Sequence, residues 1–148
     1  MADLLKGVLL QKKDGSRSRA EEVLKGKVVA LYFSAHWCPP CRKFTPILKS
    51  FYNELLSSEK FEVVFVSDDH TEEELKEYME ECHGDWFCIP YGSPKVDELE
   101  TKYSVNPIPD LIIIKADGTI IARNPSIDPE HEGQVKPPSD LLSEWTAA

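Results

Sequence analysis

Two apolar segments of this chain predict neighbouring, buried β-strands. Residues 27–34 and 61–67 are rich in β-branched and aromatic side chains, which is typical of strands covered on both faces in a parallel sheet. The apolar residues between them recur at helical spacing, at Phe44, Ile47, Leu48, Phe51, Tyr52, Leu55 and Leu56. The pattern therefore predicts a right-handed strand–helix–strand unit.

A second helix is predicted after residue 67, where Thr71 and the three glutamates behind it offer a capping box. Its apolar face consists of Leu75, Tyr78, Met79 and Cys82. Further on, residues 111–115 and 119–122 are apolar segments joined by an Asp-Gly turn, the strongest short signal for a hairpin. A hairpin beside a parallel unit makes the expected sheet mixed.

The C-terminal region predicts a last helix over residues 138–145. Ser139 is expected to cap it, and its inward face consists of Leu141, Leu142 and Trp145. Residues 124–139, rich in proline, are expected to form a long surface connection. The expected fold is α/β, a single domain over residues 1–148 with a central mixed sheet flanked by helices and an N-terminal extension.

Composition narrows the class of protein. Apolar residues make up 41% of the 148 residues and charged ones 29%, close to the globular average. No apolar run reaches the roughly 18 residues of a membrane-spanning helix, and residues 1–13 lack the basic head and cleavage site of a secretion signal. We therefore expect a cytoplasmic protein, with the nucleus as a second location and without a membrane partner.

The formal net charge of −9 is unevenly distributed along the chain. Residues 1–50 hold 10 Lys and Arg against 4 Asp and Glu, residues 51–100 hold 3 against 15, and residues 101–148 hold 4 against 7. The three net charges are thus +6, −12 and −3. An acidic chain lacks the basic footprint of a general nucleic-acid binder, so no nucleic-acid partner is expected.

The sharpest chemical signal is Trp37-Cys38-Pro39-Pro40-Cys41, which falls between the first predicted strand and the first predicted helix. Two cysteines separated by two residues either pair as a disulfide or bind a metal ion. At a helix N-terminus the backbone amides and the helix dipole favour a thiolate, which would be that of Cys38. Because the two prolines have no N–H, the amide of Cys41 is the natural local donor to that thiolate.

A zinc site is the alternative, but its ligands fit poorly. The other cysteines, Cys82 and Cys88, are separated by five residues, whereas structural zinc knuckles usually separate their ligands by two to four. Spare histidine ligands would be His36, His70 and His83. We therefore expect no metal, and we interpret Cys82 and Cys88 as packed, inert thiols.

These motifs together resemble the thioredoxin superfamily. The shared features are the Trp-Cys-Pro-Pro-Cys motif after a strand, Pro46 in the helix, and Ile108-Pro109 ahead of the last hairpin. More narrowly, the chain is similar to tryparedoxin and nucleoredoxin-like proteins in 32–35, 37–42, 44–46, 51–52, 61–65 and 103–105. The likeness covers nearly the whole chain as a tryparedoxin-like domain, but one domain only of a nucleoredoxin.

The resemblance implies a thioredoxin fold and roles for individual residues. It makes Cys38 the attacking thiol, Cys41 the resolving thiol, and Pro109 a cis proline beside them. The implied substrate-binding residues are Trp37, Pro39, Pro40, Ile108 and Pro109. Thioredoxins proper carry a buried aspartate six residues before the first cysteine, whereas this chain has Tyr32 there.

Two further departures and several cations are candidate modulators. His36 stands where relatives often have a small or acidic residue, and its imidazolium could favour the Cys38 thiolate; a solvated loop histidine is the simpler interpretation. Asp110 stands where relatives commonly have threonine, and it could oppose the thiolate or repel acidic substrates. Arg42, Lys43 and Arg123 could bind a glutathione-like carboxylate or an acidic protein, although solubility explains them equally well.

The expected function is that of a protein-disulfide reductase that forms a mixed disulfide and needs no cofactor besides its dithiol. Expected partners are disulfide-containing proteins, among them a peroxidase, with a glutathione-like thiol or a flavin reductase as electron donor. The alternative from another class is a nucleoredoxin-like adaptor that binds a signalling partner and turns over slowly. A peroxidase acting directly on hydroperoxide is a third, weaker alternative. We expect a monomer, because no long apolar surface stripe remains once the core residues are assigned.

Overall fold

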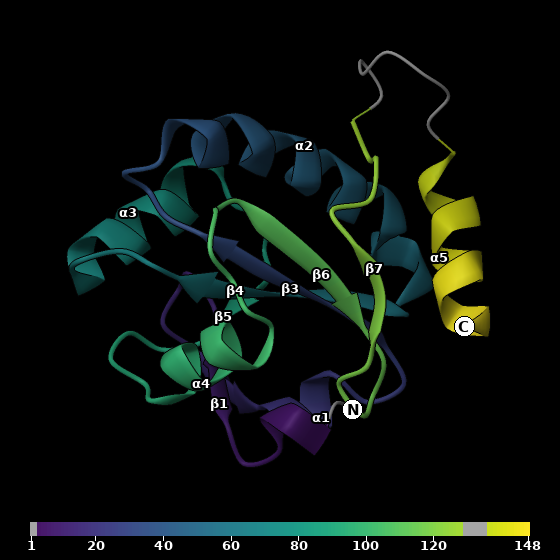
Figure 1. Ribbon diagram of the computed structural model, residues 1–148, viewed down its shortest axis with the longest axis horizontal. Helices are drawn as coiled ribbons and strands as arrows, with labels where there is room; N and C mark the ends of the chain where they lie inside the picture. Colours follow the sequence, from purple (N-terminus) through teal and green to yellow (C-terminus); the bar gives the residue numbers. More distant parts are fainter. Residues whose placement is uncertain (1–2, 129–135) are drawn as a thin grey trace.

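The computed structural model describes residues 3–128 and 136–148, which form one mixed sheet with helices on both faces (Figure 1). The described strands are β1 (Leu9–Gln11), β2 (Arg17–Arg19), β3 (Val28–Ser34), β4 (Phe61–Ser67), β5 (Phe87–Cys88), β6 (Asp110–Ile114) and β7 (Ile120–Arg123). The described α-helices are α1 (Ala20–Val23), α2 (Pro39–Leu55), α3 (Glu72–Cys82), α4 (Lys95–Lys102) and α5 (Pro138–Ala147), with 3-10 turns at Asp3–Leu5 and Leu56–Ser58. The strands lie in the order β2-β1-β5-β4-β3-β6-β7.

The predicted strand–helix–strand unit is confirmed. β3 and β4 are parallel and in register from the Val28–Phe61 pair to the Ser34–Ser67 pair, with α2 as the crossover. α3 then connects β4 to the parallel strand β5, and Thr71 caps α3 by accepting the backbone N–H of Glu74 at 3.1 Å. The carboxyl ends of β3 and β4 therefore meet at one edge of the sheet, where the Trp-Cys-Pro-Pro-Cys motif follows β3.

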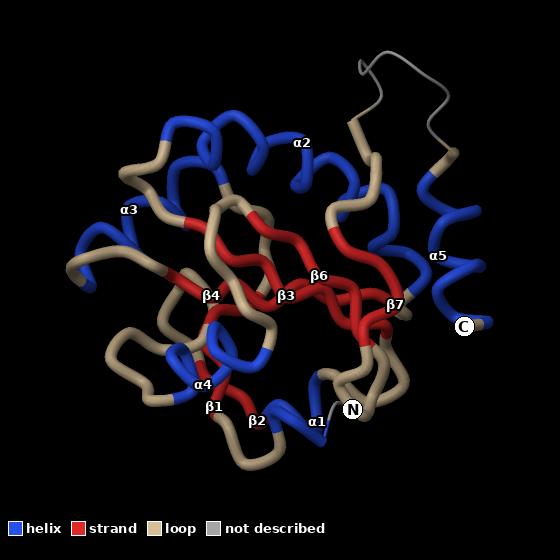
Figure 2. The backbone as a smooth tube through the Cα atoms, in the orientation of Figure 1, coloured by secondary structure: helices blue, strands red, loops and turns tan. Residues whose placement is uncertain are grey.

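The hydrophobic core has two halves, one on each face of the sheet. Ala30 and Tyr32 of β3 pack with α2, α3 and α5, whereas Leu31 and Phe33 face the opposite half, which α1 and α4 cover. Figure 2 shows the strands in the middle with these helices on either side. Because successive side chains of a strand point to opposite faces, both halves need the uninterrupted apolar runs seen in β3 and β4.

The predicted hairpin is present as β6 and β7, which makes the sheet mixed as expected. The N-terminal extension also belongs to the sheet, because β1 and β2 form a second hairpin that pairs with β5. Neither of these two short strands nor α4 was predicted from the sequence. Gly15, at φ +89° in the turn between β1 and β2, allows the tight reversal that an Asp-Gly pair signals.

The predicted N-cap of the last helix is wrong. Ser139 does not cap α5, because the helix begins at Pro138 and its N-cap residue is Pro137. The Pro137 carbonyl accepts the backbone N–H groups of Asp140 and Leu141, and Pro138, which has no N–H, suits the first helical position. Leu142 and Trp145 are buried as predicted. Most of the connection predicted over residues 124–139 lies outside the described residues, since 129–135 are not among them.

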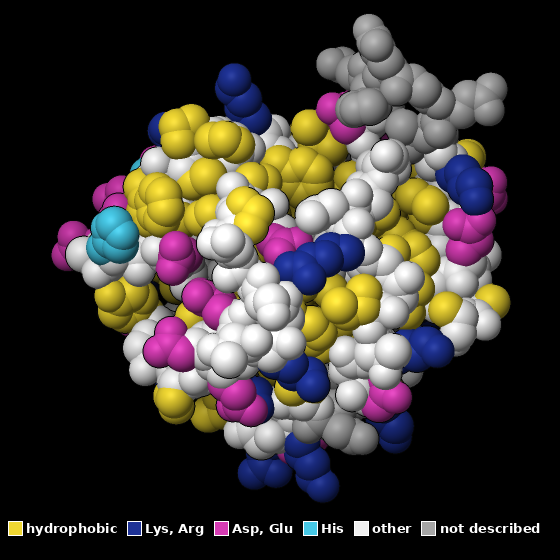
Figure 3. All heavy atoms as spheres, viewed as in Figure 1, with side chains coloured by type: hydrophobic (Ala, Val, Ile, Leu, Met, Phe, Trp, Pro, Cys, Tyr) yellow, Lys and Arg dark blue, Asp and Glu magenta, His cyan; other side chains and the backbone are white. Residues whose placement is uncertain are grey.

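The charge segregation of the sequence is also a segregation in space. Figure 3 shows Asp and Glu side chains over α3 and α4, whereas Lys and Arg side chains gather near β1 and α1. Within residues 3–128 and 136–148, no helix is both long and apolar enough to cross a membrane.

Candidate active site

The turn between β3 and α2 holds both motif cysteines. α2 begins directly after Cys38, which is its N-cap residue in an extended conformation, at φ −96° and ψ 110°. The prolines at positions 39 and 40 occupy the first helical positions, where their fixed φ suits the helix and no amide partner is needed. Cys41 completes the first turn. The sequence prediction that Cys38 sits on the helix N-terminus is therefore confirmed.

The Cys38 sulfur lies between α2 and the loop ahead of β6. Its Sγ accepts the backbone N–H of Cys41 at 3.4 Å, the donor expected from the sequence, and lies 3.8 Å from the carbonyl oxygen of Ile108. The residue is 5% exposed, and both Cys38 and Cys41 are free thiols. A thiolate formed here would be stabilised by a backbone amide and by the helix dipole.

Cys41 lies behind Cys38 and is fully buried. Burial and, to a lesser extent, the neighbouring Cys38 raise the pKa of Cys41 to about 12, although hydrogen bonds from Ser34 and the Ala35 backbone oppose the rise. The two sulfurs are therefore inequivalent: one is at the helix end beside the loop, and the other is held protonated in the core.

The loop beside Cys38 contains the cis peptide bond between Ile108 and Pro109. It leads directly into β6, which pairs with β3. The pairing of these two strands brings the loop and the dithiol together, although seventy positions separate Ile108 from Cys38. The cis proline that the resemblance implied is thus found in the expected place.

Trp37 presents an aromatic surface beside the cysteines. Its side chain is 43% exposed, its indole N–H donates to the carbonyl of Asp68 at 3.0 Å, and its ring stacks on His70 at 5.4 Å. Both prolines of the motif are exposed as well. Ile108 and Pro109 are half-buried, so these residues together form a partly apolar rim around the dithiol.

His36 is directed toward α3. Its Nε2 lies 3.0 Å from a carboxylate oxygen of Glu81, and its ring packs on Tyr78 at 5.6 Å. Its backbone N–H donates to the buried carboxylate of Asp69 at 2.7 Å. Burial raises the pKa of Asp69, although its hydrogen bonds from Ser67 and His36 oppose that rise. The influence of the His36 imidazole on Cys38 stays a prediction.

Asp110 is 2% exposed and closely paired. Its carboxylate binds the guanidinium of Arg123 through two contacts and also accepts the Asn124 amide N–H at 3.1 Å. Arg123 therefore compensates the negative charge on which the Asp110 hypothesis rests, and it is itself occupied. Arg42 and Lys43 are exposed near the start of α2, and their role toward a substrate carboxylate stays a prediction.

Three buried hydroxyl groups near Cys41 were not singled out from the sequence. These belong to Ser34, Thr45 and Tyr78, and together with Tyr32 they are linked by hydrogen bonds. A signal for them exists in retrospect, because Ser34 ends β3 and Thr45 lies one helical turn after Cys41. Tyr78 was recognised only as an apolar-face residue of α3.

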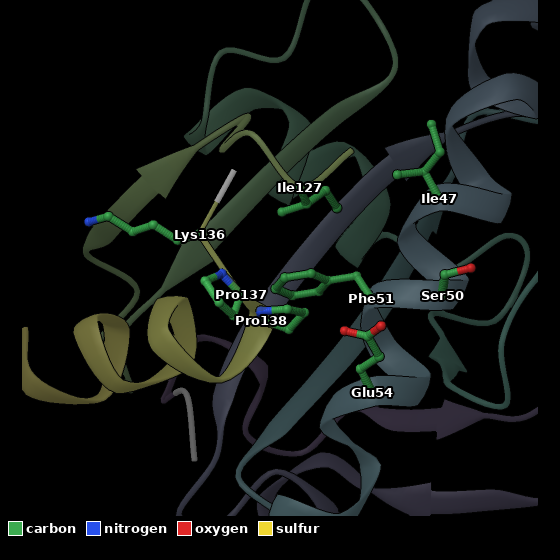
Figure 4. A pocket seen from close by; sticks show the side chains of 8 residues that line it. All are labelled: Ile47, Ser50, Phe51, Glu54, Ile127, Lys136, Pro137 and Pro138. Atoms are coloured by element: carbon green, nitrogen blue, oxygen red, sulfur yellow. The ribbon is translucent and has the colours of Figure 1, made fainter. Parts of the chain in front are cut away.

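The remaining cysteines lie away from the dithiol. Cys88 is fully buried in β5, and burial raises its pKa to about 12; Cys82 is half-buried at the end of α3, and burial raises its pKa too. Across the described ranges, no three His, Cys, Asp or Glu side chains are grouped so that they could hold a metal ion. A cavity of about 280 Å³ lies between α2 and the start of α5, where Phe51, Ile127 and Pro137 line it, and neither motif cysteine reaches it (Figure 4).

A buried cysteine lies behind an N-capping cysteine, beside a cis proline at the edge of a mixed sheet, which is an arrangement of the thioredoxin type. The family model described as Thioredoxin-like matches residues 26–120, and the chain belongs to that family as a tryparedoxin- and nucleoredoxin-like member of the thioredoxin superfamily. The family is one of thiol-disulfide oxidoreductases.

Known proteins resemble the chain to different extents. Tryparedoxin from Trypanosoma brucei brucei is 45% identical over 100 residues, 66% of this chain and 68% of that protein. Nucleoredoxin from Xenopus laevis is 37% identical over 118 residues, 78% of this chain, but the match spans only 28% of the nucleoredoxin. The crystal structure of a thioredoxin from Wuchereria bancrofti is 51% identical, with a TM-score of 0.83, 99% of this chain and 100% of that chain covered.

Proposed function

We propose that this chain is a protein-disulfide reductase that works through the dithiol of Cys38 and Cys41. The observation that carries the proposal is the inequivalence of the two thiols. Cys38 caps α2 and receives an amide N–H at 3.4 Å, whereas Cys41 is buried in the first turn with its pKa raised by burial. Cys38 is therefore suited to attack the substrate, and Cys41 is suited to react only after a mixed disulfide has formed.

The proposed reaction has two exchanges. The Cys38 thiolate attacks one sulfur of a substrate disulfide, so that a Cys38–substrate bond forms and the second substrate sulfur leaves as a thiolate. The Cys41 sulfur then attacks Cys38, the mixed disulfide breaks, and the first substrate sulfur leaves with the proton from Cys41. The substrate gains two electrons, and the chain is left with a disulfide that an external donor must reduce.

The substrate class follows from the surface around Cys38. The exposed Trp37 and the half-buried pair at 108–109 offer an accessible, partly apolar contact surface beside the dithiol. This suits an extended protein segment that carries a disulfide better than a small molecule that needs enclosure. A disulfide-bonded protein, such as an oxidised peroxidase, is therefore the proposed substrate.

Several expectations stay predictions beside this proposal. They are a glutathione-like thiol or a flavin reductase as electron donor, a monomeric single-domain chain, and a cytoplasmic location that extends to the nucleus. Because the chain spans only part of the nucleoredoxins that it matches, their activities and partners are not transferred to it.

Turnover tests the proposal. The chain is mixed with a disulfide-bonded protein and excess dithiothreitol, and reduction of the substrate is followed for the wild type, Cys38→Ser and Cys82→Ser. We expect catalytic turnover in the wild type, the uncatalysed rate in Cys38→Ser, and unchanged turnover in Cys82→Ser. A folded wild type that does not turn over, yet binds one partner only when oxidised or only when reduced, would favour the adaptor.

A further inference from the structure

Four buried hydroxyl groups form a continuous array beside the resolving cysteine. The Ser34 Oγ lies 2.6 Å from the Tyr78 hydroxyl, which lies 2.5 Å from the Thr45 Oγ1, which in turn lies 2.7 Å from the Tyr32 hydroxyl. All four side chains are fully buried. Since β3, α2 and α3 each contribute to it, the array exists only in the folded chain.

Both ends of this array reach Cys41. At one end, the hydroxyls of Thr45 and Tyr32 lie 2.8 Å and 3.4 Å from the carbonyl oxygen of Cys41. At the other end, the Ser34 hydroxyl forms a hydrogen bond with the Cys41 side chain that lowers the pKa of this thiol. The array thus closes a loop from the sulfur of Cys41 back to its own backbone.

The hydrogen bonds of the array can be donated in either of two directions along it. Each hydroxyl donates one hydrogen bond. With Cys41 as a thiol, the S–H donates to Ser34 and the donations continue to Tyr78, Thr45, Tyr32 and the Cys41 carbonyl. With Cys41 as a thiolate, the donations among the hydroxyls reverse, and Tyr32 donates to Thr45, Thr45 to Tyr78, Tyr78 to Ser34, and Ser34 to the sulfur. The contacts between the hydroxyls and with the sulfur keep a proton in both states, whereas the Cys41 carbonyl receives a donation from Tyr32 only in the thiol state.

Among the residues that the structure describes, no acidic or basic side chain forms a hydrogen bond with a hydroxyl of the array. The titratable neighbours are Cys38, the two tyrosines of the array and two histidines. The His36 ring packs on Tyr78 at 5.6 Å beside Glu81, and the His83 ring lies 4.3 Å from that of Tyr78. Burial lowers the pKa of His83 to about 3 and raises the pKa of Tyr32 to about 12, and it raises that of Tyr78 as well. Stabilisation of an anion at Cys41 must therefore come from neutral donors.

We propose that this hydroxyl array, made of Tyr32, Ser34, Thr45 and Tyr78, stabilises the Cys41 thiolate in the resolving step. Ser34 is the catalytic residue because it touches the reacting sulfur, and the other three are positioning residues that turn its proton toward that sulfur. Chains of hydrogen bonds polarise one another in a low-dielectric interior, which strengthens the last donor. This inference rests on the proposed function and replaces a carboxylate base with an array of neutral groups.

The experiment separates the two exchanges within a single turnover. The reduced chain is mixed with excess dithiobis(nitrobenzoate), an aromatic disulfide that releases one coloured thiolate when Cys38 attacks and another when Cys41 resolves the mixed disulfide. For Ser34→Ala and Tyr78→Phe we expect an unchanged first release and a second release slowed about tenfold, as for the loss of one hydrogen bond to a charged group. The pH at which the second release is half-maximal should rise by about one unit.

Tyr103→Phe is the matched control. It removes another buried tyrosine hydroxyl, which donates to the Gly118 carbonyl at 2.6 Å in the opposite half of the core. We expect this variant to release both thiolates at the wild-type rates. If Tyr78→Phe does not fold, Thr45→Val interrupts the array at its middle, and Ser34→Ala at the end that meets the sulfur.

A second release with wild-type rate and pH profile in folded Ser34→Ala and Thr45→Val would overturn the inference. An equal slowing in Tyr103→Phe would also overturn it, because the effect would then come from general loss of packing. Failure of the proposed function gives a different result, a wild type that releases neither thiolate, and that result would remove the step which the array serves.

Discussion

The carboxylate of Asp110 accepts two hydrogen bonds from the guanidinium of Arg123, Oδ1 from Nε at 3.1 Å and Oδ2 from Nη2 at 2.5 Å. Asp110 directly follows the cis proline, and Arg123 ends β7, so the pair ties the active-site loop to the last strand. Because the carboxylate is 2% exposed, it depends on this partner for its charge to be tolerated in the core.

Removing only the guanidinium of Arg123 should therefore lower the free energy of unfolding more than removing both charges of the pair. Arg123→Leu is expected to lower the free energy of unfolding by about 2 kcal/mol, less than for a fully buried pair because the arginine is 36% exposed. The double variant Asp110→Thr with Arg123→Leu should be more stable than Arg123→Leu alone, since no unpaired carboxylate remains. Denaturant unfolding measures both, and a double variant less stable than the single one would contradict this account of the pair.

His83 should make the fold sensitive to acid. Its ring is buried and accepts the Trp86 indole N–H on Nδ1 at 2.9 Å, and burial lowers its pKa from an ordinary 6.5 to about 3. The unfolded chain therefore binds a proton that the folded chain does not, so stability falls as the pH drops from about 6.5 toward 3. Between pH 7 and pH 5 this one group should remove about 2 kcal/mol.

His83→Phe tests that contribution. The variant loses the acceptor for Trp86 and is less stable at pH 7, but its stability should fall less than that of the wild type between pH 7 and pH 5. His70→Gln serves as the control, because His70 is an exposed histidine and its variant should follow the wild-type slope. Parallel stability curves for the wild type and His83→Phe would refute the assignment.

Alkylation should discriminate among the four cysteines. Cys88 is fully buried, and burial raises its pKa to about 12, so neither access nor thiolate is available in the native chain. At neutral pH we expect iodoacetamide to modify Cys38 first and Cys88 at least about a hundredfold more slowly. Peptide mass spectrometry after timed quenching gives the order, and modification of Cys88 as fast as Cys38 would show that β5 opens readily.

The sequence predicted those parts of the fold in which one local pattern determines the outcome. The apolar runs of β3 and β4 and the helical spacing of α2 each require burial, and the Asp-Gly turn fixes the β6–β7 hairpin. The strands β1 and β2 have three residues each and are half-exposed, so they show no clear alternation. Their position depends on pairing with β5, a long-range contact that no local pattern encodes.

The candidate site divides in the same way. Cys38 and Cys41 were predicted because the dithiol motif is local, whereas the cis Pro109 was implied only by the resemblance to the thioredoxin superfamily. The pairing of Asp110 with Arg123 was not predicted, since it depends on the register of β6 and β7. Likewise, Ser34 and Tyr78 are 44 positions apart, and only the packing of α3 against the sheet brings their hydroxyls together.

The central claim is that Cys38 attacks and Cys41 resolves, and covalent capture tests it most directly. Cys41→Ser is incubated with a disulfide-bonded protein, excess thiols are blocked, and the products are analysed without reductant and by peptide mass spectrometry. The account predicts a stable complex joined through Cys38, cleaved by dithiothreitol and absent from both wild type and Cys38→Ser. A complex joined through Cys82 or Cys88, or one that forms equally well in Cys38→Ser, would contradict it.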